Sequence, residues 1–454
     1  MRGGDSTKRI YSRKSQSTLG AVPASELMNI EIDDLPDVVL VEILCRLPCY
    51  KFVSKCKCVS ERWCNVMSGP YFLARFLCLQ SDREQTPIVR TLITNRGEEF
   101  LTRMSSSTKP LALLFERLMS SHHLEQEPLV VATYNDLVLC CSTGVYYQRD
   151  YYICNPCTIQ WVPVPPPPRV YRYTPVGFIC DLPYYSCTKD DQGGSFIQVN
   201  AEYRCRIVRL ILRKRSVCKL KVQIFSSDTG EWITSTISIP SGFISDTVPL
   251  ERSFSYNGML YFVGDEPGDQ NFLMGLDPFM INNSNSALSL SSTSRNSTNG
   301  DNIIDHYKCR FIRFDDPDSF LLRYLGEYRG CLHMCDYHDH TSTFFVRELK
   351  EEEMHGGAGK LCLEGMMKDY SLDIKMVPGY DIVDLRFLDP NNEDILYMYI
   401  ANDIVRYNIR TRDRLKLVEN ISYGNSFLFP IVLPWWPTPV PRLPPHAQPA
   451  GINL

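Results

Sequence analysis

In residues 31–77, near the start of the chain, apolar residues recur at helical spacing. Two series step by three and four positions: Leu40, Ile43, Leu44 and Leu47, then Phe52, Cys56, Val59 and Trp63. Pro36 suits a first helical position and Asp37 an acidic first turn. The pattern predicts two or three short amphipathic helices, which bury too little surface to fold well alone. They therefore share an apolar face with something else, either a partner or, as a helical cap, the domain that follows.

From about residue 128 the pattern changes to short strands between turn residues, which predicts an all-β domain. Units of such strands recur every 40 to 70 residues, at 129–162, 196–233, 254–314, 319–349 and 382–417. One turn repeats among them, in Cys154–Trp161, Ser227–Trp232, Leu276–Phe279 and Tyr407–Thr411. Repeated four-stranded units predict a β-propeller, in which each blade buries its faces against its neighbours. A β-sandwich is the structural alternative, but it seldom repeats one turn chemistry.

The fold class is therefore mainly β: a short all-α unit of about three helices, followed by a β-propeller with six blades as the central expectation. Between them, residues 88–93 fit a strand, and residues 111–119 fit either a strand or one helical turn. A Pro-rich segment at the end fits a stiff connector, with an SH3 or WW ligand as the alternative. The predicted divisions are a disordered basic tail (1–29), the helical unit (30–77), a connector that includes the first propeller strands (78–125), the propeller (126–433, with a flexible Ser/Asn-rich loop at 281–300) and a Pro-rich tail (434–454).

Composition restricts the function classes. The chain has 454 residues, 44% of them hydrophobic, and a formal net charge of −4, so it carries no overall electrostatic footprint for nucleic acid. No apolar run approaches the length of a membrane span, and the polar N-terminal residues lack the apolar core of a signal peptide. We expect a cytoplasmic or nuclear protein that binds neither nucleic acid nor membrane. Its 18 cysteines are then expected to be reduced.

Candidate chemistry is sparse. The chain contains no P-loop, dinucleotide fingerprint, G-x-S-x-G elbow or H-E-x-x-H motif. The best metal candidate, Cys331–His340, holds two cysteines and three histidines, but their alternation is that of one strand face, and no second ligand pair lies nearby. Cys154 and Cys157 belong to the repeated turn rather than to a helix start. In the basic run Arg204–Arg215, basic and apolar residues alternate, which is typical of a strand with one solvent-exposed face. The sequence therefore predicts no catalytic residue, no cofactor and no metal.

The helical stretch resembles an F-box. The resemblance rests on Leu35-Pro36, Leu40, Glu42-Ile43-Leu44, Arg46-Leu47-Pro48, Val59-Ser60, Arg62-Trp63, Ser68-Gly69-Pro70 and Phe72-Leu73. Small departures, at Cys56, Cys58 and Ser60-Glu61-Arg62, put no charge on the apolar stripe. The resemblance implies helix-in-groove docking to a Skp-family adaptor. It assigns the contacts to Leu35, Pro36, Leu40, Ile43, Leu44, Leu47 and Trp63. Of these, Trp63 mainly holds the helices together and is only partly exposed to the adaptor. The corresponding test is Leu44→Asp, expected to abolish adaptor binding while the propeller stays folded.

Three segments of the β-domain resemble the F-box-associated, kelch-like repeats of plant F-box proteins: Tyr152–Trp161, Val222–Trp232 and Tyr256–Tyr261. A strict kelch blade would carry a double glycine where this chain has Gly264-Asp265. The resemblance implies a non-catalytic substrate-recognition subunit of a Skp-cullin-F-box ubiquitin ligase. The adaptor would connect it to a cullin and a RING subunit, and the propeller would bind an unknown protein target. The alternatives are a propeller enzyme with a helical cap, such as a kelch-type oxidase or glycosidase, and a ligase-independent protein-binding module.

Overall fold

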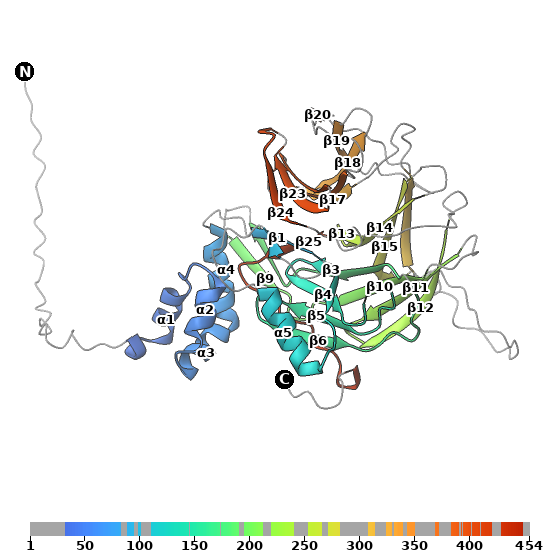
Figure 1. Ribbon diagram of the computed structural model, residues 1–454. Coiled ribbons are helices and arrows are strands. Elements are labelled where there is room, and N and C mark those ends of the chain that lie inside the picture. The colour runs from blue at the N-terminus through green and yellow to red at the C-terminus, as the bar shows by residue number, and fades with distance from the viewer. Residues whose placement is uncertain are drawn as a thin grey trace, which may run out of the picture. The chain divides into compact units, whose positions relative to one another are not determined.

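The computed structural model divides the chain into two compact units, residues 1–79 and 80–454 (Figure 1). The structure describes residues 32–447 except 83–88, 95–98, 101–109, 145, 173, 190–194, 212–218, 240–252, 266–270, 282–306, 314–323, 329–330, 339–342, 350–367, 372–382, 390–391, 393, 401, 409 and 420–427. The predicted tail at 1–29 and residues 282–300 of the predicted loop lie outside the described residues.

The first unit is helical, as the 3- and 4-residue spacing predicts, but it holds more helices than expected. A 3-10 turn precedes four α-helices: η2 (Ile32–Asp34), α1 (Asp37–Leu44), α2 (Tyr50–Cys56), α3 (Glu61–Ser68) and α4 (Pro70–Asp82). Ser60 is the N-cap of α3, and its Oγ accepts the backbone N–H of Trp63 at 3.2 Å. Pro70 opens α4 at a position where a missing N–H costs nothing.

The second unit contains five four-stranded antiparallel sheets among its described residues, which we call blades 1 to 5 in chain order. Blade 1 is β3 (Leu129–Tyr134), β4 (Leu137–Cys141), β5 (Tyr151–Asn155) and β6 (Gln160–Val164). Blade 2 is β7 (Val176–Cys180), β10 (Cys205–Ile211), β11 (Lys219–Ser226) and β12 (Glu231–Ser238). Blade 3 is β13 (Ser253–Tyr256), β14 (Met259–Asp265), β15 (Asn271–Ile281) and β16 (Tyr307–Arg313). Blade 4 is β17 (Tyr324–Tyr328), β18 (Cys331–His338), β19 (Thr343–Leu349) and β20 (Lys368–Ser371), and blade 5 is β21 (Val383–Leu388), β22 (Ile395–Ile400), β23 (Asp403–Asn408) and β24 (Arg414–Val418).

A three-stranded sheet joins the two ends of this unit. β1 (Val89–Thr94) pairs with β2 (Glu99–Phe100) and, in antiparallel register, with β25 (Leu428–Leu433). β25 in turn lies beside β3, β3 beside β7 and β7 beside β13, while β17 lies beside β21. The first strands of successive sheets thus neighbour one another, as in the blades of a propeller. The described residues thus form five four-stranded sheets and one three-stranded sheet, and the number of six blades stays a prediction.

The cores lie between blades, so several strands are buried along their whole length. All residues of β4, β5, β7 and β10 are buried, whereas most residues of the outer strand β12 are exposed or half-buried. One cluster joins blade 1 to blade 2 through residues such as Ile153 and Phe178. A second joins blade 2 to blade 3, and Leu332 of β18 packs against blade 3. A sandwich would have one shared core rather than this succession.

The repeated turn has a common physical cause. In three blades an Asn or Asp side chain of the third strand accepts the backbone N–H two residues later: Asn155 from Cys157, Asp277 from Phe279 and Asn408 from Arg410, at 2.8, 3.0 and 2.9 Å. This is an Asx turn. At Asn155 and Asn408 it ends the third strand before the chain returns as the fourth. At Asp277 it coincides with a shift in the register between β15 and β16. The sequence repeat is therefore a repeat of turn chemistry.

Two sequence assignments need correction or completion. The unit predicted over 196–233 is wrong at its start, because the first strand of blade 2 is β7. Residues 196–199 belong to a hairpin inserted after it, β8 (Tyr185–Lys189) with β9 (Ser195–Val199). Residues 196–199 are as apolar as a blade strand, so the local pattern does not distinguish the two. Residues 111–119, left open between strand and helix, lie in helix α5 (Pro110–His122), whose apolar side packs on blade 1 and on Ile431 of β25.

The Pro-rich end packs on the propeller instead of forming a tail. Residues 434–447, which we call the strap, lie against blades 1 and 2 and end in a 3-10 turn, η4 (Pro445–Ala447). Trp436, Leu443 and Ala447 are buried. The backbone N–H of Trp435 donates to Tyr185 Oη at 3.1 Å, and Tyr203 donates its hydroxyl to the carbonyl of Pro439. Prolines cannot join a sheet ladder, but here they provide an extended segment whose side chains pack laterally.

Candidate functional site

Helix α1 presents apolar side chains on two faces. Leu40, Val41 and Leu44 point into the helical unit and are buried. On another face, Ile43 is 44% exposed and Val39 is 42% exposed. Positions 39 and 43 are one helical turn apart and so share a face, which Pro36 extends on the N-terminal side. We call Pro36, Val39, Ile43 and the half-buried Leu47 the α1 stripe.

The structure therefore divides the predicted contact residues. Pro36 and Ile43 are exposed, and Leu35 and Leu47 are half-buried, so these four keep some surface that a partner can reach. Leu40 and Leu44 are buried among the helices of the chain without its partner, so their assignment as adaptor contacts stays a prediction. Trp63 is buried as well, and its partial contact with the adaptor stays a prediction. The Leu44→Asp test is also unsuitable, since a carboxylate in the core would unfold the helices themselves.

Ion pairs fix the orientation of α1. Arg75 of α4 donates to both carboxylate oxygens of Glu42, at 2.9 and 3.1 Å. This hydrogen bonding lowers the pKa of Glu42 below its ordinary value. Arg62 of α3 pairs with Asp37 at 2.8 Å and also donates to the carbonyl of Leu35. Arginine side chains of α3 and α4 thus contact α1 near both of its ends.

Several exposed apolar residues of the helical unit were not predicted as exposed. Val39 belongs to the stripe, and the others are Ile32, Val38, Phe52, Val59 and Tyr71. A signal for Val39 is present in the sequence, because the run Val38–Val41 has more apolar positions than one inward helical face can use. Periodicity predicts that Phe52 lies on the buried side of its helix. In the structure Phe52 is exposed, because Val53 is the residue of α2 that points inward.

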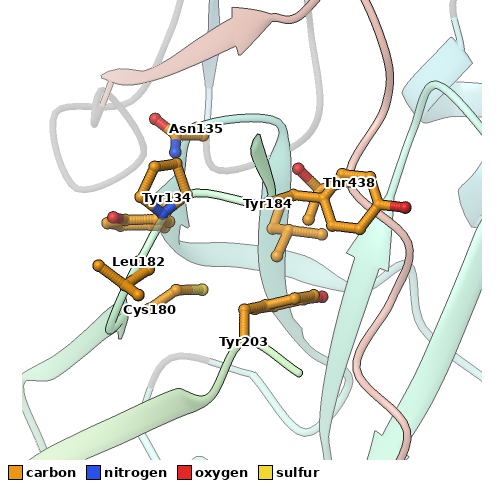
Figure 2. A pocket seen from close by; sticks show the side chains of 9 residues that line it. Tyr134, Asn135, Cys180, Leu182, Tyr184, Tyr203 and Thr438 are labelled. Atoms are coloured by element: carbon orange, nitrogen blue, oxygen red, sulfur yellow. The ribbon is translucent and has the colours of Figure 1, made fainter. Parts of the chain in front are cut away.

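The propeller has a small pocket between blades 1 and 2. Figure 2 shows Tyr134, Leu182 and Cys180 on one side of it, and Tyr184, Tyr203 and Thr438 on the other. The volume open to the centre of a water-sized molecule is only about 10 Å³. The pocket therefore has space for about one water molecule and is too small for a typical small-molecule ligand.

A buried carboxyl group attaches the strap beside this pocket. Asp136 accepts the backbone N–H and the hydroxyl of Thr438, at 2.7 and 2.6 Å, and the amide of Asn155 at 2.8 Å. Asn155 also donates to the carbonyl of Thr438. Burial raises the pKa of Asp136 to about 6, against the opposing effect of these donors. All of these partners are structural groups, so the carboxyl acts as an anchor for the strap.

Other candidate chemistry can be located only in part. The predicted metal candidate lies mostly in strand β18, as its alternation indicated, and residues 339–340 lie outside the described chain. Within the described residues, no group of three or more His, Cys, Asp or Glu side chains is placed to hold a metal ion. Among those same residues, no helix combines the length and apolarity needed to cross a membrane.

Comparison with known proteins identifies both units. Residues 32–75 match the F-box domain, and residues 92–302 match the β-propeller described as F-box protein At3g26010-like. The putative F-box/kelch-repeat protein At4g22430 of Arabidopsis thaliana is 26% identical over 256 residues, which cover 56% of this chain and 56% of that protein. F-box protein At3g26010 of the same plant is 26% identical over 243 residues, covering 52% of this chain and 50% of that protein.

The chain thus spans about half the length of the curated relatives it matches. Among solved structures, apo AztD from Citrobacter koseri overlaps 67% of this chain and 75% of that chain at 9% identity, with a TM-score of 0.30. That likeness is too low to establish a shared fold. The two domain matches agree with the helical unit and the succession of blades: the chain carries an F-box domain followed by an F-box At3g26010-like β-propeller domain, and the relatives it matches are plant F-box proteins.

Proposed function

We propose that this F-box protein is the substrate-recognition subunit of a Skp-cullin-F-box ubiquitin ligase. The α1 stripe binds a Skp-family adaptor, which connects the chain to a cullin and a RING subunit. Loops of the propeller bind the protein to be ubiquitinated. The chain itself makes and breaks no covalent bond, and it acts by raising the concentration of target near the ubiquitin-loaded enzyme. We place this role in the cytoplasm or the nucleus.

The observation that carries the proposal is the exposed apolar face of α1. Val39 and Ile43 are exposed to solvent although α1 already buries Leu40, Val41 and Leu44 in its own unit. An apolar helical face that the fold does not need, on a helix that arginine side chains contact near both of its ends, fits helix-in-groove recognition. The F-box match over the same residues supports an adaptor as the partner.

Affinity purification with mass spectrometry tests the proposal. The full chain is compared with Val39→Asp/Ile43→Asp, which charges the stripe without touching the core. We expect the wild-type chain to bring down adaptor, cullin and target, and the variant to bring down target alone. Equal recovery of adaptor by both chains would contradict the proposal. Target recovery without adaptor from the wild-type chain would instead favour a ligase-independent binding module.

A further inference from the structure

The propeller carries a second exposed surface, distinct from the pocket. It is formed by the loop between β4 and β5 and the loop between β6 and β7, and its exposed residues include Tyr146, Tyr147, Arg149, Arg169, Val170 and Arg172. We propose that this arginine–tyrosine surface is where the target docks, and that it takes an Asp/Glu-rich peptide segment. The inference rests on the proposed function, since it names the chemistry of the target-binding site.

A buried arginine brings the two loops together. Arg209 of β10 donates to the carbonyl of Gln148 in the first loop at 3.0 Å and to the carbonyl of Arg169 in the second at 3.1 Å. Its side chain is fully buried near the rings of Tyr151 and Trp232, each with its centroid 5.8 Å from the guanidinium carbon. Burying a cation is expensive unless its donors are used. Arg209 uses its hydrogen-bond donors to fix the relative position of two surface loops.

Arg209 lacks a compensating carboxylate among its described contacts. Its remaining hydrogen bond, at 2.7 Å, goes to the neutral Gln223, and its Nε has no hydrogen-bond partner among the described residues. A buried positive charge with neutral partners leaves a positive potential at the loops that it supports. That potential favours an anionic ligand over a cationic one.

Hydrogen bonds connect the described residues within each loop. In the first, Thr143 Oγ1 accepts the backbone N–H of Arg149 at 2.9 Å, and the backbone N–H of Ser142 donates to the carbonyl of Asp150 at 3.0 Å. In the second, Thr174 donates its hydroxyl to the carbonyl of Tyr171 at 3.1 Å. The adjoining proline run is tied to blade 2, because the indole of Trp232 donates to the carbonyl of Pro165 at 2.6 Å. Binding to such loops loses little conformational entropy.

The exposed groups match an acidic peptide. Arginine forks donate to carboxylates in a fixed geometry, and tyrosine rings supply contact area with few rotatable bonds. More than half of Tyr146 and Tyr147 is exposed, and the guanidinium of Arg172 lies 5.9 Å from the ring centroid of Tyr146. Asp150, which pairs with Arg149 at 3.6 Å, is the one described acidic residue in these loops. Three arginines suit a short peptide better than a nucleic-acid strand, which needs a longer basic track.

Fluorescence anisotropy with labelled peptide pools of about a dozen residues tests the inference on the full chain. One pool is rich in Asp and Glu, a second has Asn and Gln in their place, and a labelled single-stranded RNA of similar length is a third probe. We expect the acidic pool to bind about tenfold more tightly than the amide pool and to weaken as salt rises. Arg169→Gln/Arg172→Gln should weaken binding of the acidic pool about tenfold.

The matched control is Arg117→Gln/Arg410→Gln, which removes two exposed arginines from α5 and from the turn after β23. It should leave binding of the acidic pool unchanged. Equal binding of acidic and amide pools, equal losses in both double variants, or tighter binding of the RNA would each overturn the inference. Adaptor binding is measured on the same variants, so failure of the peptide site remains distinguishable from failure of the adaptor site.

Discussion

Replacing Ile43 by Asp tests the assignment of the α1 stripe. Burying an isoleucine fully is worth about 1.5–3 kcal/mol, and Ile43 is 44% exposed, so its contact with a partner contributes roughly 0.7–1.3 kcal/mol. A carboxylate in the same interface adds the cost of an unpaired buried charge, about 2 kcal/mol or more. The sum, about 3 kcal/mol, weakens adaptor binding by roughly two orders of magnitude. Because Ile43 faces solvent in the free chain, the free energy of unfolding should change by only about 0.5 kcal/mol.

Isothermal titration of the full chain with a purified Skp-family adaptor measures this loss. Val38→Asp is the matched control: it puts the same charge on the same helix, on a residue that is 67% exposed and about 140° around the axis from Ile43. It should retain wild-type affinity. Leu40→Ala, in contrast, should lower the free energy of unfolding of the helical unit by about 2–5 kcal/mol. Unchanged affinity for Ile43→Asp, or an equal loss for Val38→Asp, would refute the reasoning.

Three further predictions concern the propeller. Burial raises the pKa of Asp136 to about 6, above its ordinary value of 3.8. The stability that this group contributes is therefore complete below pH 3.8 and is lost, by about 3 kcal/mol, as the pH rises to about 6. The thermal stability of Asp136→Asn should not show this dependence on pH. Burial lowers the pKa of His122, whose Nε2 accepts the indole N–H of Trp161 at 3.1 Å. The stability that His122 contributes is therefore complete above pH 6.5 and is lost as the pH falls. The accompanying change in tryptophan fluorescence should be absent from His122→Asn. Gly230 has a φ of +68°, and in Gly230→Ala the added Cβ would overlap with the Cβ of Ala447. This substitution should lower the free energy of unfolding, measured with denaturant, by about 2–4 kcal/mol. Gly144→Ala, at a φ of +81° with open space around it, should lower it by only about 1–2 kcal/mol.

Local patterns predicted the elements of this fold well. The 3- and 4-residue steps indicated the helices around Leu40 and Trp63, and the Asx turns at Asn155 and Asn408 marked corresponding positions in different blades. Both signals depend on interactions between residues close in sequence, which is why they are visible without a structure.

The sequence could not show what depends on distant packing. Leu40 and Ile43 are equally apolar, and only the position of the neighbouring helices decides that one is buried and the other exposed. The strap has no periodicity to reveal its place, because it is held by Asp136, which lies 302 residues before Thr438 in the chain. The alternation around Arg209 predicts a basic residue on a wet strand face, whereas the structure buries it beside Tyr151 and Trp232.

Ubiquitin transfer in a reconstituted reaction tests the central claim most directly. The reaction contains the full chain, a Skp-family adaptor, the cullin and RING subunits, a ubiquitin-loaded conjugating enzyme and a protein captured by the propeller. The account predicts that ubiquitin is transferred to the captured protein with wild-type chain and with Val38→Asp, and that transfer is lost with Ile43→Asp. Transfer that proceeds equally well with Ile43→Asp, or no transfer although adaptor and captured protein are both bound to the wild-type chain, would contradict it.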